Sequence, residues 1–249
     1  MLTQVVWATD IGKKRSENQD AVICEKDIQF YAVADGMGGL PFGKKTAEMA
    51  TAFLGIYMRS SDFCGSEINR VDDFIQKAVR DVSTMIQKMG NNEFASPLYG
   101  STLTGFQVHN RQAVVFNVGD SRVYILKKDS DIKQVTKDDN MYEVLISSGE
   151  VIMTEENKKI LKNQLSQYMG MYPEVIPSTS VLDLEEGDLL CACSDGLTKM
   201  LSDENIQQIL REEETLDTRL KHLIDQANEN GGKDNISVIL LECGKAMAV

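Results

Sequence analysis

Short apolar segments along the chain predict strands, and two stretches with helical spacing interrupt them. Strands are expected over residues 4–9, 21–24 and 28–34, where β-branched and aromatic residues are bounded by polar residues or glycine. Apolar positions then recur every three or four residues over 42–59 and 67–89. This spacing predicts two successive amphipathic helices.

The strand pattern returns in the second half of the chain. Strands are predicted at 101–108, 112–118, 122–127, 132–136, 176–183, 188–193 and 235–243. Because the turns joining the first four of these are short and polar, we expect one antiparallel meander. Two further helices are expected at 203–213 and 216–229, and residues 139–170 have the weak apolar pattern of a mobile insertion with short helices.

This order of elements predicts the fold class. Strand-rich and helix-paired segments alternate, which favours an α+β fold in which each helix pair covers the face of a sheet. We therefore expect a four-layer α-β-β-α sandwich, with two mainly antiparallel sheets flanked by helix pairs. The length of 249 residues allows one large domain or two small ones, and the four prolines leave no Pro-rich linker.

Charge and composition exclude several classes of function. The chain has 38 acidic and 26 basic residues, a net charge of −12, which disfavours binding to nucleic acid or to an anionic membrane surface. It has no apolar run of about 18 residues and no signal-peptide pattern at its start, so a cytoplasmic location is expected. The five cysteines lack zinc spacing and are interpreted as structural thiols.

Candidate chemistry lies where acidic residues follow apolar strands. Asp35-Gly36, Asp120 and Asp195-Gly196 come directly after such segments, and Asp234 precedes the last one. Carboxylates that converged there would repel one another and would require a hard cation such as Mg²⁺ or Mn²⁺. Taken singly, each Asp-Gly pair is more often an ordinary turn, and spacing alone does not establish convergence.

One basic residue precedes these acids. Arg15 is expected in the loop after the first strand, where a guanidinium could hold a phosphate through two hydrogen bonds. The alternative is a solvated arginine beside Lys13 and Lys14.

Six short motifs occur in order along the chain: Arg15 with Asn18-Gln19-Asp20, Val33-Ala34-Asp35-Gly36-Met37-Gly38-Gly39, Gly100-Ser101-Thr102, Val118-Gly119-Asp120-Ser121-Arg122, Ser194-Asp195-Gly196 and Gly232-Lys233-Asp234-Asn235. Taken together, they resemble the PPM family of metal-dependent serine/threonine protein phosphatases, also called type 2C, in its bacterial form. Each motif is weak alone, but the ordered set spans residues 15–235. The whole chain, 1–249, is then expected to be a single phosphatase domain.

The resemblance implies a centre of two Mn²⁺ or Mg²⁺ ions that activates a water for hydrolysis of phosphoserine and phosphothreonine. Asp35 would bridge both ions, the Gly36 carbonyl would bind one, and Asp195 with Asp234 would complete the other. The remaining implied roles are phosphate binding by Arg15, orientation of metal-bound waters by Asp20, and a third, weaker metal site at Asp120 with Asp195.

The resemblance also implies a flap beside the active site, at residues 137–172, and a monomer that acts on phosphorylated proteins, including a Ser/Thr kinase and its substrates. Three departures stand out. Met37 replaces a histidine proposed as general acid in eukaryotic members, Gln19 replaces a frequent glutamate, and Asn157-Lys158-Lys159 occupies a stretch often rich in histidine and arginine.

Three alternatives remain open at this stage. A catalytically silent binding module would be expected to lose a metal ligand, but Asp35, Asp195 and Asp234 are all present. A phosphatase of an anti-sigma-factor antagonist would use the same chemistry on another partner. A non-catalytic calcium-binding protein would use the carboxylates only for structure, although no EF-hand-like loop is visible.

Overall fold

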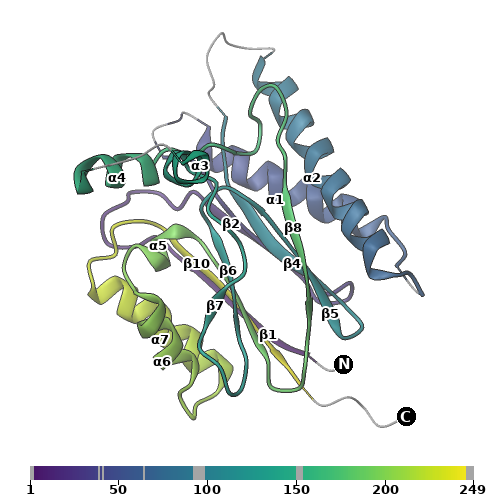
Figure 1. Ribbon diagram of the computed structural model, residues 1–249, viewed down its shortest axis with the longest axis vertical. Coiled ribbons are helices and arrows are strands. Elements are labelled where there is room, and N and C mark those ends of the chain that lie inside the picture. Colours follow the sequence, from purple (N-terminus) through teal and green to yellow (C-terminus); the bar gives the residue numbers. More distant parts are fainter. Residues whose placement is uncertain are drawn as a thin grey trace.

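The computed structural model describes residues 3–38, 40, 42–63, 65–91, 99–149 and 154–244. Two five-stranded sheets lie face to face, and helices cover the outer face of each (Figure 1). Every strand pair in both sheets is antiparallel. The predicted α+β sandwich of four layers is confirmed.

The two sheets draw on different parts of the chain. In order, the first contains β1 (Thr3–Asp10), β10 (Ile236–Cys243), β9 (Leu189–Cys193), β6 (Arg122–Leu126) and β7 (Lys133–Gln134). In order, the second contains β2 (Asp20–Glu25), β3 (Phe30–Asp35), β4 (Leu103–His109), β5 (Gln112–Val118) and β8 (Ser178–Asp183). The first and last strands pair along their whole length, with Thr3 opposite Cys243 and Asp10 opposite Ile236.

The predicted four-strand meander is wrong. Strands β4 and β5 form a hairpin in the second sheet, whereas β6 and β7 form a hairpin in the first. The chain therefore crosses between sheets at residues 119–121. Hydrophobic alternation identifies a strand but not its sheet, because the inward faces of both sheets bury the same kinds of side chain.

The helices follow the predicted pairs. The helices α1 (Gly43–Arg59) and α2 (Ile68–Asn91) cover the second sheet, and α6 (Asp203–Leu210) with α7 (Leu216–Glu229) covers the first (Figure 1). A four-residue helix that the sequence pattern did not predict, α5 (Asp195–Thr198), follows β9 directly. No helix in the described ranges is long and apolar enough to cross a membrane.

Three apolar layers hold the sandwich together. One lies between α1, α2 and the second sheet, one between the two sheets, and one between the first sheet and α5 to α7. Cys191 and Cys193 lie in the last of these layers and are fully buried, as expected for structural thiols. A core continuous on both faces of each sheet makes the strand ends rigid supports.

Residues 137–172, the expected flap, contain two short helices, α3 (Met141–Ser148) and α4 (Glu155–Lys162). Asn140 and Thr154 cap their N-termini through side-chain hydrogen bonds. Residues 150–153 lie outside the described residues. The two helices project beside one end of the sheets, near α5 (Figure 1). Movement of this segment as a flap stays a prediction.

Candidate active site

The candidate acids gather at one end of the sandwich because the strands that carry them are antiparallel. Asp20 begins β2 and lies directly opposite Asp35, which ends β3. In the other sheet, Asp195 follows the end of β9, while Asp234 precedes β10 and Asp120 precedes β6. Because β9 pairs antiparallel with both β6 and β10, all three meet at the same edge. The chain termini lie at the opposite end (Figure 1).

These carboxylates influence one another strongly. Burial raises the pKa of Asp35 well above its ordinary value, and the charges of Asp20, Asp195, Asp120 and Asp234 raise it further. Burial, reinforced by the charge of Asp195, raises the pKa of Asp20 to about 6 and that of Asp120 to about 7. The acids predicted from separate motifs thus form one electrostatic cluster.

Two buried oxygens of the cluster have no hydrogen-bond partner. They are Oδ1 of Asp20 and Oδ1 of Asp195. An unpaired buried carboxylate oxygen is costly, so its presence at two positions points to a group that binds them in the working protein. Hard, anionic oxygens of this kind fit a divalent cation such as Mg²⁺ or Mn²⁺.

Two basic side chains contact the cluster directly. Lys199, one turn after Asp195, forms an ion pair with that carboxylate and lies 3.6 Å from Oδ2 of Asp234. Arg15 donates to the same Asp234 oxygen at 2.8 Å. Burial by itself would lower the pKa of Lys199, but the two carboxylates raise it overall. Among the described residues, no group of three or more His, Cys, Asp or Glu side chains is placed closely enough to hold a metal ion without rearrangement.

A buried asparagine holds the loop that carries Arg15. The Asn235 amide donates to the carbonyl oxygens of Ile11 (2.9 Å) and Glu17 (3.0 Å), and its Oδ1 accepts from the backbone N–H of Gln19 (2.9 Å). These bonds fix residues 11–19 against the start of β10. Arg15 is nevertheless 41% exposed at its side chain, so its guanidinium remains accessible from the cleft.

Two hydroxyl groups form hydrogen bonds that position the acids. Ser194 Oγ donates to Oδ2 of Asp20 at 2.8 Å and accepts from the backbone N–H of Ser237 at 2.9 Å, which joins the two sheets at the cluster. Thr102 Oγ1 accepts from the backbone N–H of Asp35 at 2.9 Å. These contacts position both facing carboxylates of β2 and β3.

The glycines after the acids are required by close backbone packing. A Cβ at Gly36 would lie 2.5 Å from the carbonyl of Gly43, and one at Gly196 would lie 1.9 Å from the carbonyl of Asn235. Neither position accepts a larger residue without backbone movement. The close approach at both glycines is therefore made to the protein's own backbone.

The cluster opens into a cleft of about 980 Å³ between the sheet ends and α4. It is lined by Arg15, Asp35, Met37, Gly38, Thr102, Asp120, Glu155, Lys158, Lys159, Lys162, Asn163, Leu165, Asp195, Lys199, Met200, Lys233 and Asp234. Asp20 and Gly36 are not among the residues that line the cleft. Met37 thus occupies a position in the cleft itself, but its thioether cannot donate a proton.

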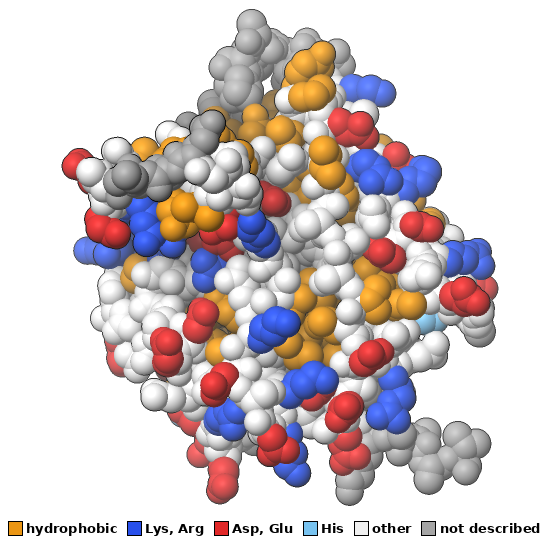
Figure 2. Space-filling view, viewed as in Figure 1, with side chains coloured by type: hydrophobic (Ala, Val, Ile, Leu, Met, Phe, Trp, Pro, Cys, Tyr) orange, Lys and Arg blue, Asp and Glu red, His pale blue; other side chains and the backbone are white. Residues whose placement is uncertain are grey.

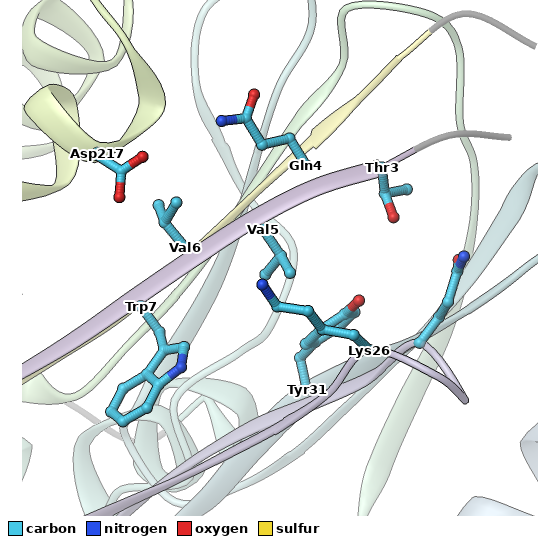
Figure 3. Close-up of a pocket in the computed structure, with 9 residues that line it drawn as sticks. Thr3, Gln4, Val5, Val6, Trp7, Lys26, Tyr31 and Asp217 are labelled. Atoms are coloured by element: carbon cyan, nitrogen blue, oxygen red, sulfur yellow. The ribbon is translucent and has the colours of Figure 1, made fainter.

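A second cleft runs along β1, away from the acids (Figure 3). It is lined by Thr3, Gln4, Val5, Val6, Trp7, Lys26, Gln29, Tyr31 and Asp217. One carboxylate and one ammonium group do not make an acidic cluster, so the first cleft is the candidate active site. His109 and His222 line neither cleft and contact the Ser66 carbonyl and the Glu212 carboxylate, respectively.

Three contributors to the site were not assigned from the sequence. Asn235 and Ser194 lie inside recognised motifs, but their hydrogen bonds to residues far away in the chain become visible only in the fold. Lys199 had a weak signal, since a lysine four residues after an acid on a helix can reach it. That signal was lost because α5 was not predicted.

Comparisons with known proteins agree with this geometry. The family described as Protein phosphatase 2C matches residues 12–240. The serine/threonine phosphatase Stp of Listeria innocua is 33% identical over 240 residues, covering 95% of this chain and 94% of its own. The chain belongs to the protein phosphatase 2C family, and its activity is that of a serine/threonine protein phosphatase.

Solved structures support the same assignment. The serine/threonine phosphatase of S. agalactiae has a TM-score of 0.86 at 33% identity, with 97% of this chain and 100% of that chain covered. The catalytic domain of the phosphatase PstP, solved with two manganese ions, has a TM-score of 0.81 at 27% identity, with coverages of 98% and 99%. The predicted family and enzyme class are confirmed.

Proposed function

We propose that the acidic cluster binds two divalent cations, Mn²⁺ or Mg²⁺, and that they activate water for direct hydrolysis of phosphoserine and phosphothreonine in proteins. The observation that carries this proposal is the convergence of Asp20, Asp35, Asp195 and Asp234 at one end of the sandwich, with two buried oxygens unpaired. The similar PstP domain binds two manganese ions. Together these favour a cation centre over a structural cluster.

The residues divide naturally into two ligand sets. Asp35, whose pKa is raised by all four other carboxylates, would serve both ions, and the Gly36 carbonyl would serve one of them. Asp195 and Asp234, which both contact Lys199, would serve the other ion. Asp20, held by Ser194, acts through bound water.

A third, weaker cation site is proposed at Asp120 with Asp195. After burial, the charge of Asp195 is the largest influence on the pKa of Asp120. The two carboxylates therefore interact strongly. One carboxylate shared between two sites makes the third ion the most weakly bound.

When bound, the cations lower the pKa of a water molecule and neutralise charge on the phosphoryl oxygens. The chain's own residues position the substrate. Arg15, already anchored on its loop by Asn235, holds the phosphoryl oxygens through its guanidinium. Met37 has no proton to donate to the leaving oxygen.

A covalent phosphoenzyme is not part of the proposal. None of the described residues that line the cleft is a cysteine or a histidine. Cys191, buried beside Cys193, has its pKa raised well above the ordinary thiol value by that neighbour and by burial. Neutral, buried thiols are poor nucleophiles, so direct attack by water is favoured.

The physiological substrates proposed are phosphorylated proteins, including a Ser/Thr kinase and its targets, and the proposed form is a monomer. A silent binding module is disfavoured because every proposed carboxylate ligand is retained. No feature of the site, as far as the structure describes it, favours a phosphatase that acts only on an anti-sigma-factor antagonist.

The test is hydrolysis of p-nitrophenyl phosphate and of a phosphothreonine peptide with Mn²⁺, with EDTA, and with Asp195→Asn. We expect activity with Mn²⁺, loss of that activity in EDTA and recovery on adding Mn²⁺ back. Activity that persists in EDTA would contradict the metal mechanism. Absence of hydrolysis with Mn²⁺ on both substrates would favour the binding module.

A further inference from the structure

One face of α4 presents three lysines to the active-site cleft. Lys158, Lys159 and Lys162 all line it, together with Glu155 from the first turn. The three lysines follow Glu155 by three, four and seven residues, and this spacing places all four side chains on the same side of an α-helix. The lysines therefore form one continuous basic surface above the acidic cluster.

The opposite wall carries Lys199 and Lys233. Because Lys199 is paired with Asp195, it belongs to the cluster, whereas Lys233 is exposed at the rim. In Figure 2, blue side chains gather beneath α4 around a few red ones. This concentration of positive charge contrasts with the net charge of −12 for the whole chain.

Two of the α4 lysines, Lys158 and Lys162, are held in place but not neutralised. The ammonium groups of Lys158 and Lys162 lie 5.6 Å and 5.1 Å from the centre of the Tyr142 ring on α3. The nearest carboxylate contact of Lys158 is with Glu155 at 3.9 Å, and Glu155 is 91% exposed. An exposed pair at that distance is weak, so a ligand can replace it.

The cleft volume of about 980 Å³ is far more than a phosphoryl group requires. Residues flanking the phosphorylated side chain would therefore pass beneath α4. Carboxylates at those flanking positions would meet the lysine ammonium groups, whereas basic side chains would be repelled.

We propose that Lys158, Lys159 and Lys162 select phosphoserine and phosphothreonine segments flanked by Asp or Glu. This inference rests on the proposed function, because it assigns the sequence context of that site's substrates. The lysines act on binding of the flanking residues and not on the reacting phosphoryl group. Small substrates without flanking residues are therefore expected to depend on them less than peptides do.

The experiment compares two phosphothreonine peptides that differ only in Glu or Gln at the flanking positions. Hydrolysis is measured as kcat/KM with Mn²⁺, and binding is measured separately by calorimetry. The wild-type protein is expected to favour the Glu peptide by about five- to tenfold at low salt, since each exposed ion pair contributes little and three are available. The preference should shrink at high salt.

Three variants make the test specific. K158Q/K159Q/K162Q should lose the preference, and K158E/K159E/K162E should reverse it toward the Gln peptide. The control K128Q/K133Q/K221Q removes the same charge from exposed lysines outside the cleft and should keep it. Hydrolysis of p-nitrophenyl phosphate, which has no flanking residues, is measured for every variant and should be unchanged in the control K128Q/K133Q/K221Q.

Equal preference in wild type and K158Q/K159Q/K162Q, or no preference in wild type, would overturn the inference. Failure of the wild type to hydrolyse p-nitrophenyl phosphate would count against the proposed function instead. In that case, the calorimetric comparison of the two peptides still decides whether the α4 lysines read acidic flanks.

Discussion

Two groups of acidic residues lie near the same end of the sandwich, but only one of them finds all its hydrogen-bond partners within the chain. Asp138 accepts two hydrogen bonds from Arg122, at 2.9 Å and 2.8 Å, and a third from Gln134 at 2.9 Å. Asp20 and Asp35 instead face each other across two strands, and one Asp20 oxygen has no partner. The first group is satisfied by the chain, and the second is not.

This difference separates structural from functional acids. Arg122 also donates to the Tyr124 hydroxyl, which donates in turn to Asp203, so Asp138 belongs to a closed network. An acid paired with a permanent cation needs nothing further. Carboxylates that raise one another's pKa need an external cation, and this requirement distinguishes the proposed metal ligands from their neighbours.

Removing the central acid should give the largest effect on catalysis. Asp35→Asn is expected to lower kcat/KM at least about a hundredfold, because the proposed bridging charge is lost. In EDTA the same variant should be at least as stable as the wild type, since a buried repulsion is relieved. Steady-state kinetics and thermal unfolding check both parts. Full activity, or marked destabilisation in EDTA, would contradict the assignment.

Breaking the satisfied group should instead reduce stability. Arg122→Ala leaves the partly buried Asp138 without its cation and is expected to cost about 3 kcal/mol of unfolding free energy. Lys77→Ala is the matched control, because Lys77 pairs with Asp81 at the surface, where a pair contributes less than about 1 kcal/mol. Denaturant unfolding of both variants measures the difference. Equal losses would remove the distinction drawn between the two groups.

The acidic cluster should also impose a pH dependence on stability in EDTA. The folded-state pKa of Asp120, about 7, exceeds the ordinary value, so the folded protein holds this proton more tightly than the unfolded chain does. That contribution favours folding below about pH 4 and is lost as the pH rises through about 7.

Asp120→Asn should therefore gain stability relative to wild type over this range, by on the order of 2 kcal/mol at pH 7.5. Unfolding curves at several pH values in EDTA provide the measurement. A difference between the two proteins that is constant with pH would show that Asp120 does not titrate as described.

The smallest effect is expected at Lys199. Its ammonium group competes with a cation for Asp195 and Asp234, so Lys199→Met should tighten Mn²⁺ binding by about tenfold. Lys159→Met, which removes a lysine from α4 in the same cleft, is the control and should change binding little. Calorimetric titration of both variants compares them. Unchanged or weaker Mn²⁺ binding in Lys199→Met would refute the competition.

Much of this arrangement could be predicted from the sequence because local patterns determine it. Strand β3 and helix α1 follow directly from their apolar spacing, and Asp35 was predicted at the strand end where the fold places it. The exchange of sheets between β5 and β6 could not be predicted, because alternation is the same in either sheet. Pairing between distant segments decides such features.

The candidate site likewise combines features that local sequence patterns predict with features that depend on contacts between distant segments. Asp35, Asp120 and Asp195 were recognisable because each follows a predicted strand beside glycine. Asp234 was recognisable because it precedes a predicted strand, and Asp20 only through the family resemblance. Their roles as ligands stay predictions. The bonds of Asn235 to the Arg15 loop join positions more than 200 residues apart in sequence and have no local signature. The basic face of α4 required the helix to be placed over the cleft before its charge had meaning.

The central claim is that the carboxylates at the sandwich end are assembled to bind cations. Its most direct test is calorimetric titration of Mn²⁺ into EDTA-treated and dialysed wild type and Asp35→Asn, with thermal unfolding followed in parallel. Two tightly bound ions per chain in wild type, a rise in its Tm, and loss of both effects in Asp35→Asn are predicted. Identical isotherms for the two proteins would contradict the claim.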